Sequence, residues 1–192
     1  MELNQKTLDK SYQEWFQHFL KSAPAAFLKH GYERGDGSGM AASKEAIATF
    51  LKRVNQDSVI LDAGAGATTW IFNKLTGNKV ITIDRDKGYL GVVATVVTVN
   101  SHMACDARFD GGFPDCDFCF FDYSHTNDRI EFLPLAVNAA KKGVYIDDYD
   151  YRESSMEYKG KVDRFAAENN MSIQYCKSSE DRFGRSGAWL LR

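Results

Sequence analysis

Residues 59–70, VILDAGAGATTW, decide the fold of this chain. An apolar run ends in Asp62, and Gly64 and Gly66 then alternate with alanines before a segment that can begin a helix. Glycine has no Cβ atom, so the backbone can turn sharply after a strand and a ligand can approach it closely. The first N–H groups of the helix would be free and would carry a partial positive charge. The stretch therefore predicts a strand, a ligand-binding turn and a helix.

Strand-like and helix-like segments alternate on both sides of this turn. The strands are expected at 58–62, 79–84, 116–122, 143–148, 171–176 and 186–192, and the helices at 5–21, 43–54 (with Ser43 as N-cap), 67–77 (closed by Gly77), 129–142 and 161–170. Residues 85–105 are expected to hold a short helix and a further strand. Such alternation is typical of a parallel sheet covered on both faces. We predict an α/β protein with a doubly wound, mostly parallel seven-stranded sheet, helices on both faces and a C-terminal antiparallel hairpin.

Length and composition indicate one globular domain. The chain has 192 residues, 44% of them hydrophobic and 26% charged. Residues 1–54 are expected to form an N-terminal helical cap with a glycine-rich loop at 31–40, and residues 55–192 the α/β core. The helix at 5–21 has one aromatic face, which predicts either core packing or a homo-oligomer contact.

Charge and cysteine content limit which partners and which cellular compartment we expect. The net charge of −2 provides no field for holding polyanions, so a nucleic-acid partner is not expected. No apolar run reaches the roughly 18–20 residues that span a bilayer, and the N-terminus lacks the pattern of a secretory signal. The four cysteines show no paired framework, and Cys119 lies in the apolar run FCFF. We therefore expect a cytoplasmic protein with reduced thiols and no membrane contact.

Four predicted strands end in a carboxylate: Asp62, Asp84, Asp122 and Asp147. In open α/β sheets, ligands bind beyond the carboxyl ends of the strands, so this set predicts a site. Asp84 could accept both hydroxyls of a ribose, although a turn residue is the alternative. Asp106 could accept from an adenine amine, or could be a solvated loop acid.

The glycine turn differs from a dinucleotide fingerprint. In GxGxxG or GxGxxA the last position would be small, and here it is Thr69. Asp62, two residues before Gly64, would repel a pyrophosphate and favour an ammonium group. The turn thus favours a ligand with a cationic amino-acid portion.

The order LDAGAGATT, ITID, ACDA, FCFFD, GVYIDD and a terminal hairpin resembles the class I S-adenosylmethionine-dependent methyltransferases from about Gly39 onward. The resemblance implies that S-adenosyl-L-methionine is the cofactor. It implies a binding site formed by Asp62, Gly64, Ala65, Gly66, Thr68, Asp84, Arg85, Asp106 and Ala107. Two positions depart from the family pattern: Cys105 replaces the usual glycine before Asp106, and Thr68 stands where a third glycine is common.

Within that class, FFDYSHTNDR and IDDYDY are most similar to the catechol O-methyltransferase-like small-molecule enzymes. The resemblance implies a Mg²⁺ site at Asp122, Asp147 and Asp148, since three carboxyl groups suit a hard cation that keeps several waters. The alternative is that these acids are satisfied by backbone N–H groups or by Arg152.

Asp122 and His125 are the predicted catalytic residues. His125 could take a proton from the attacking group, or could be a solvated loop residue. Tyr149 and Tyr151 could line an acceptor pocket or pack at a strand end. The NPPY-type tetrad of base-modifying enzymes is replaced by DYSH, which lowers the expectation of a DNA or RNA base as acceptor.

We therefore expect methyl transfer to a small-molecule acceptor, at oxygen. A nucleotide-cofactor (NAD-type) oxidoreductase and a non-catalytic S-adenosylmethionine-binding module are the two alternatives.

Overall fold

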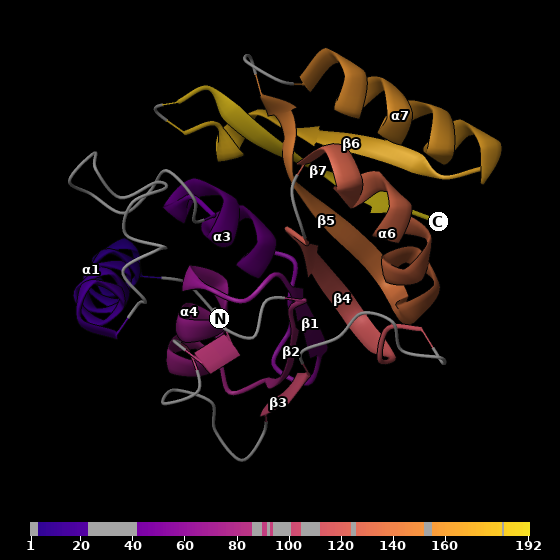
Figure 1. The fold of residues 1–192 in the computed structure, drawn as a ribbon. Helices are drawn as coiled ribbons and strands as arrows, with labels where there is room; N and C mark the ends of the chain where they lie inside the picture. Colours follow the sequence, from indigo (N-terminus) through magenta and orange to yellow (C-terminus); the bar gives the residue numbers. More distant parts are fainter. Residues whose placement is uncertain are drawn as a thin grey trace.

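A computed structural model describes most of the chain (Figure 1). The described residues are 4–22, 42–85, 90–91, 93, 101–104, 112–123, 126–151, 155–181 and 183–192. The predicted glycine-rich loop at 31–40 lies outside them, as does most of the segment 85–105.

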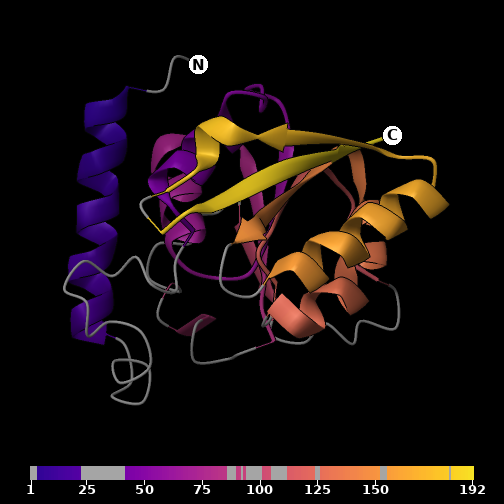
Figure 2. The same cartoon turned by 90° about the horizontal axis from the view of Figure 1, so that it is seen from above.

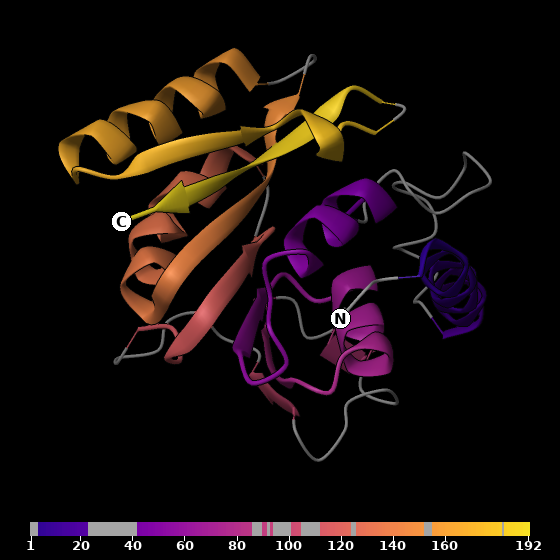
Figure 3. The ribbon, with the colours of Figure 1, turned by 180° about the vertical axis from the view of Figure 1, so that it is seen from behind.

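One seven-stranded sheet runs through the molecule, with the strand order β3-β2-β1-β4-β5-β7-β6. The strands are β1 (Val59–Ala63), β2 (Lys79–Ile83), β3 (Ser101–Ala104), β4 (Cys116–Phe121), β5 (Ala140–Tyr151), β6 (Ser172–Cys176) and β7 (Arg185–Leu191). β3, β2, β1, β4 and β5 are parallel, whereas β7 pairs antiparallel with both β5 and β6. Figure 3 shows the sheet from behind, with β3 at one end and the antiparallel pair at the other. The predicted fold class is confirmed.

Helices cover both faces of the sheet. They are α1 (Gln5–Ser22), α3 (Lys44–Leu51), α4 (Ala67–Leu75), α6 (Thr126–Ala139) and α7 (Ser155–Glu168), and a short 3₁₀ turn, η2, spans Lys177–Ser179. In Figure 2, α1 is outermost on one side, α3 and α4 lie between it and the sheet, and α6 and α7 cover the other side.

The two faces arise from the alternation of side chains along each strand. Ile60 of β1 and Phe120 of β4 belong to the hydrophobic core beneath α1, α3 and α4. Their chain neighbours Leu61 and Phe121 belong to the core beneath α6 and α7. A strand that is buried on both faces needs an uninterrupted apolar sequence, which explains why VIL and FCFF could be recognised.

Several element boundaries differ from the sequence-based expectation. β5 begins at Ala140 and continues to Tyr151, so α6 ends at Ala139 and not at residue 142. α7 begins at Ser155, six residues before its predicted start, and α3 ends at Leu51. α4 ends at Leu75, because Thr76 is already extended. Apolar periodicity cannot locate such ends, since the register of β5 against its neighbours overrides local preference.

The aromatic face of α1 packs within its own chain. Leu8, Trp15 and Phe19 are fully buried, and the Trp15 ring lies 6.1 Å from that of Trp70 in α4. The core alternative is therefore confirmed for this face, while oligomerisation stays untested. Among the described residues, the helices include none with the length and apolar character to cross a membrane.

Candidate functional site

The glycine turn is tied to the ends of both neighbouring strands. Gly64 has φ +118° and donates its N–H to Ile83 O (2.9 Å). The Asp122 N–H donates to Ala63 O (2.8 Å). A Cβ on Gly64 would overlap the carbonyl oxygen of Asp122 and lie 2.9 Å from its carbonyl carbon. Backbone conformation and contact distance thus both require glycine at this position.

Thr69 closes the beginning of α4. Its hydroxyl accepts from the Gly66 N–H (3.1 Å) and donates to Asp62 Oδ2 (2.5 Å). The Thr68 side chain is buried, and its hydroxyl lies 3.4 Å from Gly64 O. A Cβ on Gly66 would meet no atom within 4 Å, so the described residues leave room beside this N-terminus. Sequence reasoning treated Thr69 only as a departure from a fingerprint and missed its capping role.

Asp62 lies beneath the turn. Its side chain is fully buried, and Thr82 is a second, weaker hydroxyl neighbour at 3.4 Å. Burial raises the pKa of Asp62 to about 7, while the hydroxyls of Thr68 and Thr69 oppose the shift and the charge of Asp122 adds to it. That Asp62 favours the ammonium group of a ligand stays a prediction. Asp62 supports the turn through Thr69.

Asp84 spans from the end of β2 to the glycine turn. Its Oδ2 accepts from the Ala65 N–H at 2.7 Å. Arg85, which follows it, is exposed. This geometry brings together the predicted cofactor residues Asp62, Gly64, Ala65, Gly66, Thr68 and Asp84. The predicted site residues Asp106, Ala107 and His125 lie outside the described residues.

The acids of β4 and β5 converge at the same edge of the sheet. One carboxylate oxygen each from Asp122, Asp147 and Asp148 lies within 4.8 Å of the others. Consecutive residues of a regular strand point to opposite faces, but β5 has a register shift against β7 between Ile146 and Asp150. Asp148 adopts φ +52° within this bulge, which turns its carboxylate toward that of Asp147. The predicted convergence is confirmed, although the strand continues beyond it.

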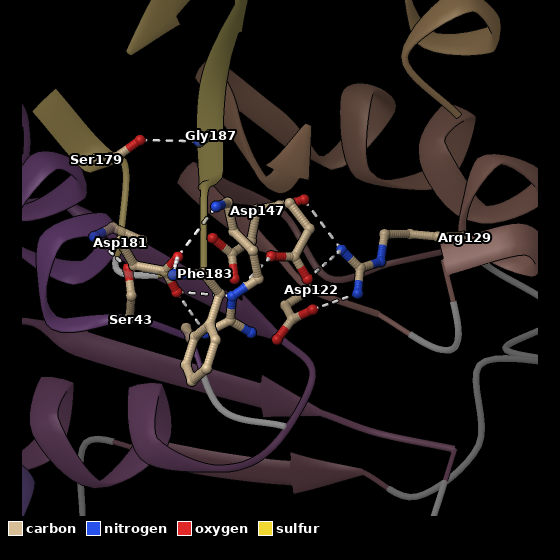
Figure 4. A network of polar contacts seen from close by, with 12 residues as sticks. Ser43, Asp122, Arg129, Asp147, Ser179, Asp181, Phe183 and Gly187 are labelled. Carbon is tan, nitrogen blue, oxygen red and sulfur yellow. Dashed lines mark hydrogen bonds and ion pairs between the residues drawn. The ribbon is translucent and has the colours of Figure 1, made fainter. Parts of the chain in front are cut away.

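Two arginines that sequence reasoning missed contact this acid cluster, and Figure 4 labels one of them, Arg129. Arg129 of α6 forms an ion pair with Asp122 and donates to Asp147 O at 3.0 Å. Arg185 of β7 lies 3.8 Å from Asp148 Oδ1 and binds Asp181 Oδ2 through Nη2 (2.6 Å) and Nε (2.7 Å). Arg152, named as the alternative partner, lies outside the described residues.

Burial and mutual repulsion perturb the acids. Burial raises the pKa of Asp122 to about 6, with Arg129 opposing the shift and Asp148 adding to it. Burial also raises the pKa of Asp147 well above its usual range, and the charges of Asp148 and Asp122 add to the effect. Asp122 and Asp147 therefore hold their protons more tightly than isolated carboxylates do.

The aromatic candidates near the cluster belong to the core. Tyr149 is buried and donates its hydroxyl to Asp163 at 2.5 Å, which confirms packing at the strand. Tyr123, next to Asp122, is fully buried against Phe113 and Phe132. The side chain of Tyr151 lies outside the described set.

No protein-family model matches the sequence, and no curated protein matches it either. Solved structures do match the fold. One is magnesium protoporphyrin IX methyltransferase (ChlM) from Synechocystis PCC 6803 with bound SAM, with a TM-score of 0.62, 12% identity and coverage of 95% of this chain and 97% of that one. Another is 1,6-didemethyltoxoflavin-N1-methyltransferase from Burkholderia thailandensis with S-adenosylhomocysteine, with a TM-score of 0.56, 14% identity and coverage of 93% and 88%.

A third match is an rRNA methylase from Streptococcus thermophilus, with a TM-score of 0.53, 14% identity and coverage of 79% and 96%. Two further matched structures are longer chains, of which this chain spans 65% and 64%. At such identities the likeness shows the fold alone, which is the Rossmann-like methyltransferase fold. The matched proteins are S-adenosylmethionine-dependent methyltransferases of several kinds and do not single out the catechol-type branch.

Proposed function

We propose that this protein is an S-adenosylmethionine-dependent methyltransferase that acts on a small-molecule acceptor, at oxygen. The observation that carries the proposal is the turn after β1. Gly64 lies against the Asp122 backbone, the Ala65 N–H donates to Asp84, and the described residues leave room beside Gly66. This turn lies where β2 and β4 flank β1 from opposite sides, which is the switch point at which doubly wound sheets bind nucleosides.

Each part of the cofactor has a partner in the proposed site. The free N–H groups at the start of α4 and the turn at Gly64–Gly66 would receive the methionine portion. Asp84 would accept from the ribose hydroxyls, and Asp106 with Ala107 would meet the adenine. Asp62 would act indirectly, by fixing Thr69 and thereby the path of the turn. The low net charge and the DYSH segment support a small molecule over a nucleic acid.

The proposed reaction is a direct displacement in which an acceptor hydroxyl attacks the sulfonium methyl group. Holding both reactants at near-attack distance would supply most of the rate. Asp122 is 21% exposed and is the member of the acid cluster that lies against the turn, so it is the proposed base for the acceptor hydroxyl. With its pKa raised to about 6, it would accept a proton at neutral pH. His125 is proposed to assist from the adjoining segment.

Isothermal titration calorimetry with S-adenosylhomocysteine and S-adenosylmethionine tests the cofactor site. Replacing Asp84 by Ala removes charge-assisted hydrogen bonds worth about 1.5–3 kcal/mol, so affinity should fall about 10- to 100-fold. Asp84→Asn keeps one acceptor and should lose less. Asp57→Ala, at an exposed position away from the turn, is the control and should bind like the unmodified protein. Absence of heat for both compounds with the unmodified protein would refute the proposal.

Two further experiments distinguish the proposed methyltransferase from an oxidoreductase and from a binding module without activity. NADH fluorescence would respond to a nucleotide-dependent oxidoreductase and should stay unchanged here. A binding module without activity would bind the cofactor but transfer no labelled methyl group to any hydroxyl compound in a broad acceptor screen.

A further inference from the structure

The guanidinium group of Arg129 contacts all three residues of the acid cluster. Its Nη2 forms the ion pair with Asp122 Oδ1, and its Nη1 donates to the backbone oxygen of Asp147 at 3.0 Å. The same Nη1 lies 4.0 Å from Asp148 Oδ2. Figure 4 shows the side chain reaching from α6 toward Asp122 and Asp147. One fixed cation therefore already lies among the acids that were predicted to bind Mg²⁺.

Arg129 is built into the fold rather than resting on its surface. Its side chain is 5% exposed, and its Cζ atom lies 5.9 Å from the centre of the Tyr158 ring in α7. A second guanidinium, that of Arg185, approaches Asp148 from β7. Guanidinium groups are not deprotonated in proteins, so both stay charged.

A divalent ion fits this donor set poorly. Mg²⁺ requires near-ideal octahedral geometry, with oxygen ligands at about 2.0–2.1 Å. In the structure an oxygen of Asp122 is directed to Arg129, and both oxygens of Asp148 face guanidinium groups. A dication bound there would lie close to two fixed positive charges, which would repel it. Moving Arg129 away would leave a buried cation without its partners.

We propose that Arg129 is the resident cation of this cluster and takes the position that a divalent ion would otherwise occupy. Arg129 is then a positioning residue that acts through Asp122. Because the Asp122 backbone packs directly on Gly64, the ion pair holds the proposed base in register with the cofactor turn. The catalytic consequence, that methyl transfer needs no divalent metal, rests on the proposed function. The part of the proposal that places Arg129 where a divalent ion would bind does not rest on the proposed function.

Manganese binding tests the proposal without knowledge of the acceptor. Mn²⁺ is titrated into metal-free protein and followed by calorimetry and by loss of the free-ion electron paramagnetic resonance signal. We expect no saturable site in the unmodified protein. Arg129→Met removes the fixed charge and should create a saturable site, whose affinity for Mn²⁺ is at least about tenfold above any weak binding by the unmodified protein. Arg164→Met, the same change on the exposed side of α7, should bind like the unmodified protein.

A saturable Mn²⁺ site in the unmodified protein that is lost in Asp147→Asn would overturn the proposal. The proposal would also be overturned if the unmodified protein and a folded Arg129→Met variant bound Mn²⁺ with equal affinity. Should Arg129→Met fail to fold, Arg129→Lys serves instead. This variant keeps the positive charge and should still show no saturable Mn²⁺ site. Saturable Mn²⁺ binding by Arg129→Lys would count against the proposal. S-adenosylhomocysteine titrations on the same samples report on the proposed function separately.

Discussion

The buried carboxyl of Asp62 should make the protein less stable as pH rises. Its pKa is raised from 3.8 to about 7, chiefly by burial. A group that binds its proton more tightly in the folded state contributes most to stability below its unfolded pKa. That contribution is lost between about pH 4 and pH 7, as the unfolded chain releases the proton first. The shift corresponds to about 4 kcal/mol, from 1.36 kcal/mol per pKa unit.

Replacing Asp62 by Asn removes this titration and keeps an oxygen that can accept from Thr69. We expect the difference in unfolding free energy between Asp62→Asn and the unmodified protein to shift by about 4 kcal/mol in favour of the variant between pH 4 and pH 8. Asp147 titrates in both proteins, so its contribution is common to both, whereas the charge of Asp122 is part of the Asp62 shift that the difference measures.

Urea denaturation at a series of pH values, followed by tryptophan fluorescence, measures this difference. Asp57→Asn, which changes an exposed acid, is the control. The difference in unfolding free energy between Asp57→Asn and the unmodified protein should not change comparably with pH. A difference between Asp62→Asn and the unmodified protein that is the same at pH 4 and pH 8 would refute the reasoning. It would mean that water or a rearranged loop solvates the carboxylate.

Two pairs of variants test the glycine contacts. Gly64→Ala should lower the unfolding free energy by at least about 2 kcal/mol, because its Cβ would overlap the Asp122 carbonyl and its φ is +118°. Gly66→Ala should retain stability in urea titrations, because its Cβ meets no described atom within 4 Å, but should weaken S-adenosylhomocysteine binding in calorimetry by entering the open space. Gly187→Ala should cost about 1–3 kcal/mol of unfolding free energy, because its Cβ would overlap both the hydroxyl and the adjoining ring carbons of Tyr145. Adding Tyr145→Phe should recover part of that loss in a double-mutant cycle, and purely additive effects would contradict the contact.

The acid cluster shows how a local irregularity creates a site. Asp147 and Asp148 are consecutive, and a regular strand would place them on opposite faces of the sheet. The bulge in β5 and the left-handed conformation of Asp148 bring both carboxylates to the Asp122 side. Strained backbone of this kind persists where the surroundings fix it, and here guanidinium groups of two arginines lie within 4.0 Å of the Asp148 carboxylate.

Much of the architecture could be predicted because short segments of the sequence determine its strands and turns. The apolar runs VIL and FCFF indicate strands buried on both faces, and the turn at Gly64 indicates a sharp connection to a helix. The carboxyl ends of parallel strands lie at one edge of a sheet. Asp84 and Asp122 follow such strands and were therefore expected at that edge.

Only the tertiary structure decided how those acids behave. Nothing near Asp62 in the sequence indicates that it lies beneath the turn with a pKa of about 7, because burial depends on strands that pack from elsewhere in the chain. The partners of the acid cluster were equally hidden, because Arg129 comes from α6 and Arg185 from the terminal hairpin. Sequence places charges along a chain, but the docking of helices and strands decides which opposite charges they meet and how much water remains around them.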